Sequence, residues 1–353
     1  MAAFWSPCEP PFQQRYSFLF SPASQAGQWR KTHDAEMTKE CDLPLIDLSR
    51  LHCGDEKERT ACVAEIGRAS SEWGFFQVVN HGIQSELLQA VGREQRKPFG
   101  APFEEKTGQK FLNGSYRWGN PTAISLAQFS WSESFHLPLS VLAGDDHACH
   151  EELEPFRSQV ASFSYAPEVM RKASTAMADL ARILAGVLAE NLGCRGDLFA
   201  DSCGEGSCFL RLNRYPPCPF SSDTFGLVPH TDSDFLTILH QDHVGGLHLM
   251  KDTRWVSVKP NPEALIVIIG DLFQACLAWS NDLYKSVEHR VMTNGKVERY
   301  SIAYFLCPSY EFTIGSYRKP SRYRNFTFGE FRKQVQEDVK KIGYKVGLSR
   351  FLA

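Results

Sequence analysis

From Cys208 to Leu306 the chain is a succession of short apolar segments rich in β-branched and aromatic residues. Turn residues separate them about every eight to twelve positions, a spacing typical of a β-sandwich or barrel. The segments are CFLRLNRY, FLTILHQ, GGLHLM, RWVSVK, ALIVIIGD, KSVEHRV and RYSIAYFL. This part of the chain therefore predicts a jelly-roll-like β structure.

The first half of the chain has mainly helical patterns. Apolar residues recur at helical spacing between Pro167 and Leu192, and Gly193 is well placed to end that helix. The other expected elements are strands over Leu43–Leu48 and Gly74–Gly82, helices over Glu56–Glu72, Gln84–Glu94 and Phe328–Lys341, and an irregular aromatic stretch over Lys97–Leu142. We expect an α+β protein whose N-terminal helices support a β-rich half.

These patterns divide the chain into parts of one catalytic unit. Residues 1–42 are broken by prolines and have no period, so we expect a disordered leader. Residues 43–205 form the mainly helical region, 206–312 the β domain and 313–353 a tail that contains the last helix.

Composition narrows the partners and the compartment. The net charge of −3 gives no basic surface for nucleic acid or anionic lipid, and no apolar run approaches the about 20 residues of a membrane span. The eleven cysteines form no CxxC pair, so we expect reduced thiols and a cytoplasmic protein, with the nucleus as an alternative. The N-terminus lacks a secretory signal, and an organelle transit peptide is the less favoured interpretation.

A histidine and an aspartate stand two residues apart in the segment PHTDSDFLTILHQ. His230 and Asp232 would share one face of a strand, and His289 lies in a later segment. Two imidazoles and one carboxylate can occupy one face of an octahedral ion and leave three positions open, as in non-haem Fe(II) oxygenases. An ordinary hydrogen-bonded pair is the alternative. The remaining histidines, His136 and His248 among them, are expected in the core, turns or surface.

Two further pairs of polar residues have the same spacing. Arg299 and Ser301 share one strand face, and a guanidinium on an apolar strand needs an anion, because an unpaired buried charge is very costly. Asn213 and Tyr215 form a similar pair that can donate hydrogen bonds to an acid. The alternatives are a salt bridge to a protein carboxylate and a tyrosine that closes a strand before Pro-Pro.

With these residues, the chain resembles the plant 2-oxoglutarate- and Fe(II)-dependent dioxygenases over residues 43–343. The matching stretches are GFFQVVNHG, NRYPPC, PHTDSDFLTILHQD, VGGLHL, WVSVKP, IGD, YKSVEHRV and RYSIAYFLCP. The resemblance implies a double-stranded β-helix core (jelly-roll, cupin-like), O2 as a co-substrate and ascorbate as a reductant. It also implies Fe(II) bound by His230, Asp232 and His289, and 2-oxoglutarate bound by Arg299, Ser301, Tyr215 and Asn213.

Three segments are most similar to gibberellin 2-oxidases of the branch that acts on twenty-carbon gibberellins. They are HTDSDFLTILHQDHVGGLHLMKD, LNGSYRWG and FSWSESFH. This resemblance implies an enzyme that hydroxylates a small molecule at its 2β position and so inactivates a plant hormone. Gibberellin 20-oxidases carry HCDP where this chain has HTDS, which favours the 2-oxidase. A 20-oxidase or another related dioxygenase is the alternative.

A gibberellin is an apolar polycycle with carboxylates, so its pocket should be aromatic with one or two cations. We expect substrate contacts from Tyr116, Arg117, Trp131 and Phe135, with Arg117 on a carboxylate. Core packing of these aromatic residues is the alternative.

One departure from the family pattern precedes His289. The chain has three more residues than expected between Gln274 and Ser280, at Ala275–Ala278. The insertion can leave His289 in register or displace it. Displacement would make the protein a catalytically impaired binding variant.

Overall fold

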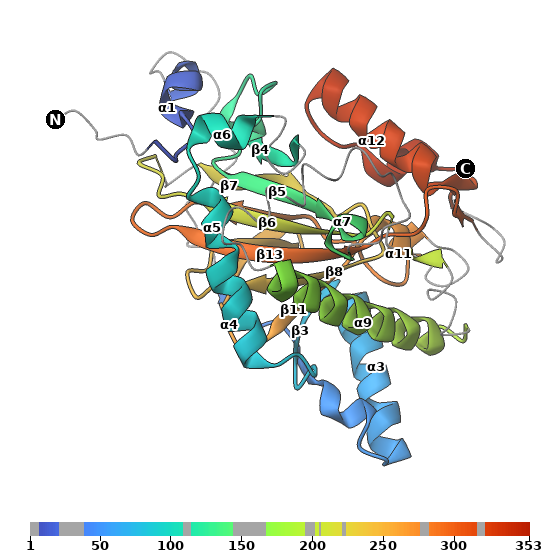
Figure 1. Ribbon diagram of the computed structural model, residues 1–353. Helices are drawn as coiled ribbons and strands as arrows, with labels where there is room; N and C mark the ends of the chain where they lie inside the picture. The colour runs from blue at the N-terminus through green and yellow to red at the C-terminus, as the bar shows by residue number, and fades with distance from the viewer. Residues whose placement is uncertain are drawn as a thin grey trace.

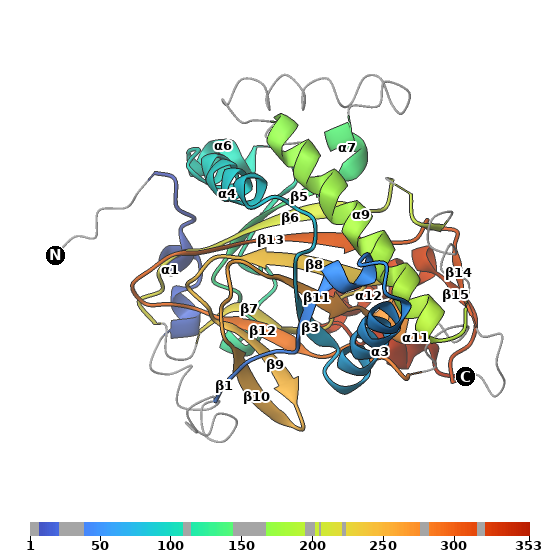
Figure 2. The same cartoon turned by 90° about the horizontal axis from the view of Figure 1, so that it is seen from below.

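The computed structural model describes residues 7–20, 39–108, 114–143, 167–194, 202–204, 206–220, 224–275, 282–315 and 322–353. Two β-sheets pack face to face. Helices α3 (Glu56–Glu72), α4 (Ser85–Glu94) and α9 (Pro167–Asn191) cover the outer face of the larger sheet (Figures 1 and 2). This is the α+β jelly-roll arrangement that the sequence predicts.

The larger sheet has eight strands and the smaller has five. In spatial order the larger contains β2 (Leu45–Asp47), β3 (Phe75–Val79), β11 (Leu265–Ile269), β8 (Leu236–Gln241), β13 (Arg299–Leu306), β6 (Phe209–Tyr215), β5 (Glu133–Pro138) and β4 (Tyr116–Trp118). The smaller contains β1 (Glu40–Cys41), β10 (Arg254–Val258), β9 (Leu247–Lys251), β12 (His289–Met292) and β7 (Phe225–His230), and a separate pair is β14 (Thr313–Ile314) with β15 (Phe326–Thr327).

Strand β11 shows why the larger sheet is a continuous apolar layer. Leu265, Val267 and Ile269 belong to the core under the helices. Ile266 and Ile268 belong to the core between the two sheets. Because successive side chains point to opposite faces, a strand covered on both sides reads as an unbroken apolar run.

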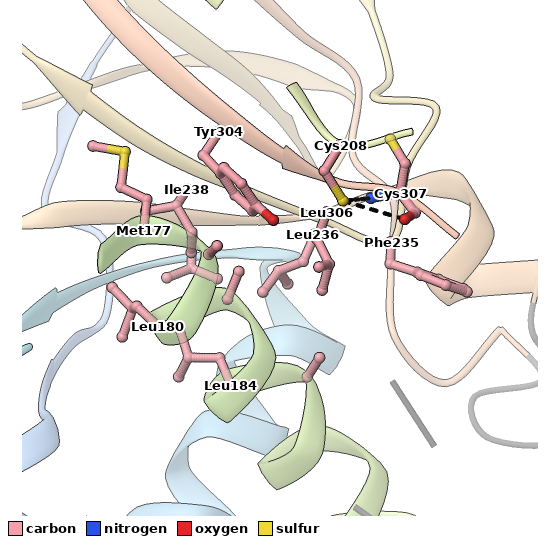
Figure 3. Packing of buried hydrophobic residues seen from close by; sticks show 14 of the residues in the cluster. Met177, Leu180, Leu184, Cys208, Phe235, Leu236, Ile238, Tyr304, Leu306 and Cys307 are labelled. Carbon is pink, nitrogen blue, oxygen red and sulfur yellow. Dashed lines mark hydrogen bonds between the residues drawn. The ribbon is translucent and has the colours of Figure 1, made fainter. Parts of the chain in front are cut away.

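The helices pack around this layer. They are α1 (Phe12–Arg15), α3 (Glu56–Glu72), α4 (Ser85–Glu94), α5 (Arg96–Phe99), α6 (Phe103–Thr107), α7 (Leu139–Ala143), α9 (Pro167–Asn191), α11 (Asp271–Ala275) and α12 (Phe328–Ile342), with 3-10 turns at Ser17–Phe20, Leu48–Leu51, Leu126–Gln128 and Gly347–Phe351. The long helix α9 buries Met177, Leu180 and Leu184 against the sheet beside Ile238 and Leu306 (Figure 3).

The helices expected from periodicity are confirmed to within one or two residues. Helix α3 has the predicted bounds and begins at Asp55, whose side chain accepts a hydrogen bond from the Lys57 amide. Helix α9 ends just before Gly193, which has a positive φ of 74°. Helix α12 begins with a capping box between Thr327 and Glu330.

The stretch Lys97–Leu142 is more regular than expected. It contains strands β4 and β5, and β5 pairs along its whole length with β6, placing Glu133 opposite Arg214. Residues 43–205, which the sequence predicts to be mainly helical, therefore contribute β2, β3, β4 and β5 to the larger sheet.

The prediction of a disordered leader is wrong for residues 7–20. Phe12 stacks on Trp131 with ring centroids 4.6 Å apart, and Tyr16 lies 4.3 Å from Phe129. Burial of these aromatic rings offsets the entropy of ordering the segment.

Two expectations from composition concern thiols and membranes. The free thiols in the described ranges include Cys41, Cys53, Cys62, Cys203, Cys208, Cys218 and Cys307. None of the described helices is long and apolar enough to cross a membrane.

Burial along α9 generates a stability prediction. Leu184 is fully buried, whereas its neighbour Ile183 is 44% exposed. Leu184→Ala should lower the free energy of unfolding by about 2–5 kcal/mol, because it leaves a cavity in the core. Ile183→Ala is the matched control and should change it by about 0.5 kcal/mol or less. Urea unfolding followed by circular dichroism measures both, and equal effects would contradict this packing.

Candidate functional site

The pairing of β7 with β12 brings three potential metal ligands together. His289 lies directly opposite His230 across the antiparallel pair, and Asp232 follows two residues after His230. The Nε2 atoms of both histidines lie 3.7 Å from Oδ1 of Asp232. Within the described ranges this is the one group of three such side chains with ligand atoms mutually within 4.8 Å.

Backbone carbonyls orient both imidazoles. Nδ1 of His230 lies 2.8 Å from the Val228 carbonyl, and Nδ1 of His289 lies 3.1 Å from that of Val287. Each Nδ1–H donates to its carbonyl, which leaves the Nε2 lone pair free to bind a metal. Two such nitrogens and a carboxylate oxygen can hold a divalent ion and leave coordination positions open.

Burial sets the charges of this group. Desolvation, reinforced by His289, lowers the pKa of His230 to about 3, so the imidazole is neutral at physiological pH. Burial disfavours the charge on Asp232, but the adjacent imidazoles and the Thr237 hydroxyl outweigh it and hold its pKa below the ordinary value. A metal ion binds a neutral imidazole and an ionised carboxylate, so these shifts favour metal binding.

A second carboxyl group, that of Asp234, lies next to Asp232 and shares a hydrogen-bond partner with it. The Thr237 hydroxyl lies 2.7 Å from Oδ2 of Asp232 and 2.9 Å from Oδ2 of Asp234. Burial and the neighbouring Asp232 raise the pKa of Asp234 well above its ordinary value. A hydroxyl has one proton, so Thr237 can donate to only one of the two carboxyls at a time, and this shared contact ties Asp234 to Asp232.

A buried cation lies on the facing sheet. Arg299 of β13 is 2% exposed and donates to Gln241 at 2.8 Å and weakly to Ser301 at 3.4 Å. Its guanidinium lies over the Tyr215 ring, 4.9 Å from the centroid. Among the described residues no carboxylate pairs with it, so the expected alternative of a protein salt bridge finds no support.

The register of β13 with β6 joins the two predicted polar pairs. Arg299 lies opposite Tyr215, and Ser301 lies opposite Asn213. The Asn213 amide lies 3.4 Å from the Ser301 hydroxyl. The four side chains therefore form one polar patch on the inner face of the larger sheet.

One cavity of about 270 Å³ joins this patch to the three potential ligands. Its apolar walls include Phe209, Leu227, Leu247, Val291 and Phe305. Two more cations, Arg211 and Arg332, line it together with His136.

The residues predicted to contact a substrate lie elsewhere. Tyr116, Trp131 and Phe135 are buried, and none of them lines the cavity. Tyr116 donates to Glu133, and Phe135 packs in the core. Arg117 is exposed and donates to backbone carbonyls, including its neighbour's at 2.7 Å. Their position agrees with the packing alternative.

Neither Arg211 nor Arg332 is among the site residues predicted from the sequence, and His136 is predicted to lie in the core, in a turn or on the surface. Arg211 stands opposite His136 in the register of β5 with β6, and it donates to Ser134 at 3.3 Å. Burial, with Arg211 and Arg332 nearby, lowers the pKa of His136 to about 4, so its imidazole is neutral at physiological pH. A clue was available in LRLNRY, where Arg211 stands two residues before Asn213 and therefore on the same face.

The longer connection before His289 leaves that ligand in place. Ala275 ends α11, and residues 276–281 lie outside the described ranges. On either side, the Gln274 side chain accepts from the Ser286 amide at 2.6 Å and donates to Asp282 at 3.1 Å. These contacts hold both ends of the insertion together, and His289 stays opposite His230, so of the two outcomes left open by the sequence His289 remains in register.

Comparisons with known proteins agree with this geometry. A family model described as the 2OG-Fe(II) oxygenase superfamily matches residues 206–308, and one described as the non-haem dioxygenase in morphine synthesis N-terminal matches residues 43–155. Gibberellin 2-beta-dioxygenase 6 of Oryza sativa subsp. japonica is 55% identical, over 88% of this chain and 85% of its own length. Gibberellin 2-beta-dioxygenase 8 of Arabidopsis thaliana is 53% identical over 98% of both chains. The crystal structure of JOX2 in complex with 2OG, Fe and JA has a TM-score of 0.72 and 30% identity, over 98% of this chain and 99% of that one.

The site predicts one divalent ion per chain. His289→Ala should weaken binding of Co(II), a redox-stable probe, by more than the about 10- to 100-fold that loss of an outer-shell partner costs. The control is His243→Ala, an exposed turn residue outside the cavity, which should bind as the wild type does. Absorption titration measures both constants. Wild-type affinity in the His289 variant would exclude this residue as a ligand.

Proposed function

The chain belongs to the 2OG-Fe(II) oxygenase superfamily, and we propose that it hydroxylates gibberellins at the 2β position, with 2-oxoglutarate and O2 as co-substrates. Such a reaction serves gibberellin catabolism. Similarity to gibberellin 2-beta-dioxygenases over nearly the whole chain supports the substrate class.

The observation that carries this proposal is the shared cavity. Two histidines and an aspartate line it from the side of the smaller sheet. Arg299 lines it from the larger sheet, and no protein carboxylate among the described residues pairs with it. A dianionic, metal-chelating co-substrate fits both features, because one end can bind the ion and the other the guanidinium.

His230, Asp232 and His289 would hold Fe(II), and ascorbate would serve as the reductant. The bound Fe(II) and 2-oxoglutarate supply the oxidising chemistry, which inserts one oxygen atom of O2 into a substrate C–H bond and releases succinate and CO2. The Val228 and Val287 carbonyls orient the two imidazoles, and burial keeps His230 neutral. The adjacent imidazoles and the Thr237 hydroxyl hold the pKa of Asp232 below its ordinary value.

Arg299 and Ser301 would bind the far carboxylate of 2-oxoglutarate. The planar guanidinium can present two N–H groups to the two oxygens of a carboxylate. Tyr215 and Asn213 are the further contacts, since they face the same patch. Gln241 fixes the guanidinium from the other side through its 2.8 Å hydrogen bond.

Arg211 and Arg332 are better placed than Arg117 to bind a carboxylate of the gibberellin. Both line the cavity, and neither forms an ion pair with a protein carboxylate among the described residues. Leu227, Leu247 and Val291 would pack against the apolar ring system and exclude water.

The compartment is part of the same proposal. We place the enzyme in the cytoplasm, with the nucleus as the alternative, because buried cysteines such as Cys62, Cys203 and Cys307 are free thiols. Imaging of a C-terminal fluorescent fusion tests this assignment.

A product assay tests the reaction. Purified protein with Fe(II), ascorbate, 2-oxoglutarate and a twenty-carbon gibberellin should form succinate and a product one oxygen atom heavier, hydroxylated at the 2β position. His289→Ala should abolish both. Oxidation at carbon 20 would instead identify a gibberellin 20-oxidase, and succinate at background with no oxidised product would contradict the proposal.

The cavity arginines predict a selective change in substrate affinity. Arg211→Met should raise the KM for the gibberellin about 10- to 150-fold, the value of a charge-assisted hydrogen bond, and change the KM for 2-oxoglutarate much less. Arg117→Met is the control and should leave both constants near the wild-type values, because Arg117 is exposed and outside the cavity. Steady-state kinetics decides, and the reverse order of effects would restore the prediction for Arg117.

A further inference from the structure

The metal-ligand region contacts a lysine from the C-terminal end of the chain. Lys345 follows helix α12 and lies beyond the 206–308 family match. Its side chain is 13% exposed, and its ammonium donates to the Thr231 carbonyl at 2.9 Å and to the Ser233 hydroxyl at 2.8 Å. It also lies 3.3 Å from the carbonyl of Asp232. The ammonium therefore binds the residues on both sides of this ligand.

The same ammonium forms an ion pair with Asp271, at 2.6 Å from Oδ2. The backbone N–H of Asp271 donates to the Asp232 carbonyl at 3.0 Å. Oδ1 of Asp271 accepts from the Ser286 hydroxyl at 2.7 Å, three residues before His289. Lys345 and Asp271 thus connect the segment that bears Asp232 to the segment that leads into His289.

The local backbone places the ammonium at this junction. Gly347 has a positive φ of 69°, a conformation that side chains other than glycine rarely adopt. A Cβ atom at Gly347 would lie 3.3 Å from Oδ2 of Asp271 and 3.2 Å from Cε of Lys345. The turn after α12 is therefore packed tightly against the ion pair.

We propose that Lys345 is a positioning residue for the metal site. Its ammonium holds the turn around Asp232 and, through Asp271 and Ser286, the approach to His289, so that the three ligand atoms keep the spacing that a divalent ion requires. This inference rests on the proposed ligands, because it assigns Lys345 a role toward the same ion. Outer-shell partners of this kind orient ligands and tune metal affinity.

A purely structural role is the competing explanation. In that case Lys345 would only fasten the C-terminal segment to the β domain. Its loss would then lower the thermal stability of the metal-free protein without changing the metal affinity of the folded fraction. A metal-binding measurement separates the two roles.

The test is an anaerobic Co(II) titration of Lys345→Met, which keeps most of the apolar stem and removes the ammonium. We expect the Kd for Co(II) to rise about 10- to 100-fold, as for loss of other outer-shell partners, with a changed visible absorption spectrum of the bound ion. The control is Lys341→Met in the exposed ion pair with Glu337, which should leave the Kd and the spectrum unchanged. The thermal midpoint of each metal-free variant is measured in parallel.

An unchanged Kd and spectrum in folded Lys345→Met would overturn the proposal. Should that variant fail to fold, Lys345→Gln decides by the same criteria, because its shorter, neutral amide cannot form the ion pair with Asp271. If the wild-type protein does not bind Co(II), or if its Kd for Co(II) equals that of His289→Ala, then the proposed ligands are wrong. Failure of the inference and failure of the proposed function are therefore distinguishable.

Discussion

A buried guanidinium without a protein carboxylate in the described part of the chain explains more of this structure than any other single contact. Arg299 has Gln241, Ser301 and the Tyr215 ring as its neighbours, and these stabilise a cation without neutralising it. A buried charge costs several kcal/mol unless an opposite charge compensates it, on the order estimated for buried ions in proteins. One wall of the cavity can therefore bind an anion, and the opposite wall, with two imidazoles and a carboxylate, can bind a cation. A metal-chelating dicarboxylate satisfies both walls.

Strand register turns these separate residues into one site. Antiparallel pairing of β7 with β12 sets His230 against His289, and pairing of β13 with β6 sets Arg299 against Tyr215. A shift of one residue in either pair would turn its polar side chains away from the cavity. The apolar cores on the two faces of the larger sheet resist such a shift. Alternate residues of β11 and β13 are buried in the core under the helices, and a shift of one residue would move them to the other face.

The sequence predicts those parts of the site that follow strand alternation. Arg299 shares a face with Ser301, and His230 with Asp232, so a period of two was enough to find both pairs. The substrate wall could not be found in this way. Trp131 is aromatic and stands five residues before the cavity residue His136, but residues 7–20 bury it. Packing between distant segments leaves no periodic signal in the sequence. Arg332 and Lys345 belong to a charged C-terminal segment, where an arginine or lysine that faces inward looks like its exposed neighbours.

We propose that one cavity binds the metal and 2-oxoglutarate together, and thermodynamic coupling between the two ligands tests this most directly. Anaerobic calorimetry would measure the Kd of 2-oxoglutarate for the wild-type protein with and without saturating Co(II). We expect the metal to tighten 2-oxoglutarate binding by about 5- to 150-fold, and 2-oxoglutarate to tighten metal binding by the same factor. Equal affinities with and without the metal would show that the two sites are independent and would contradict the account.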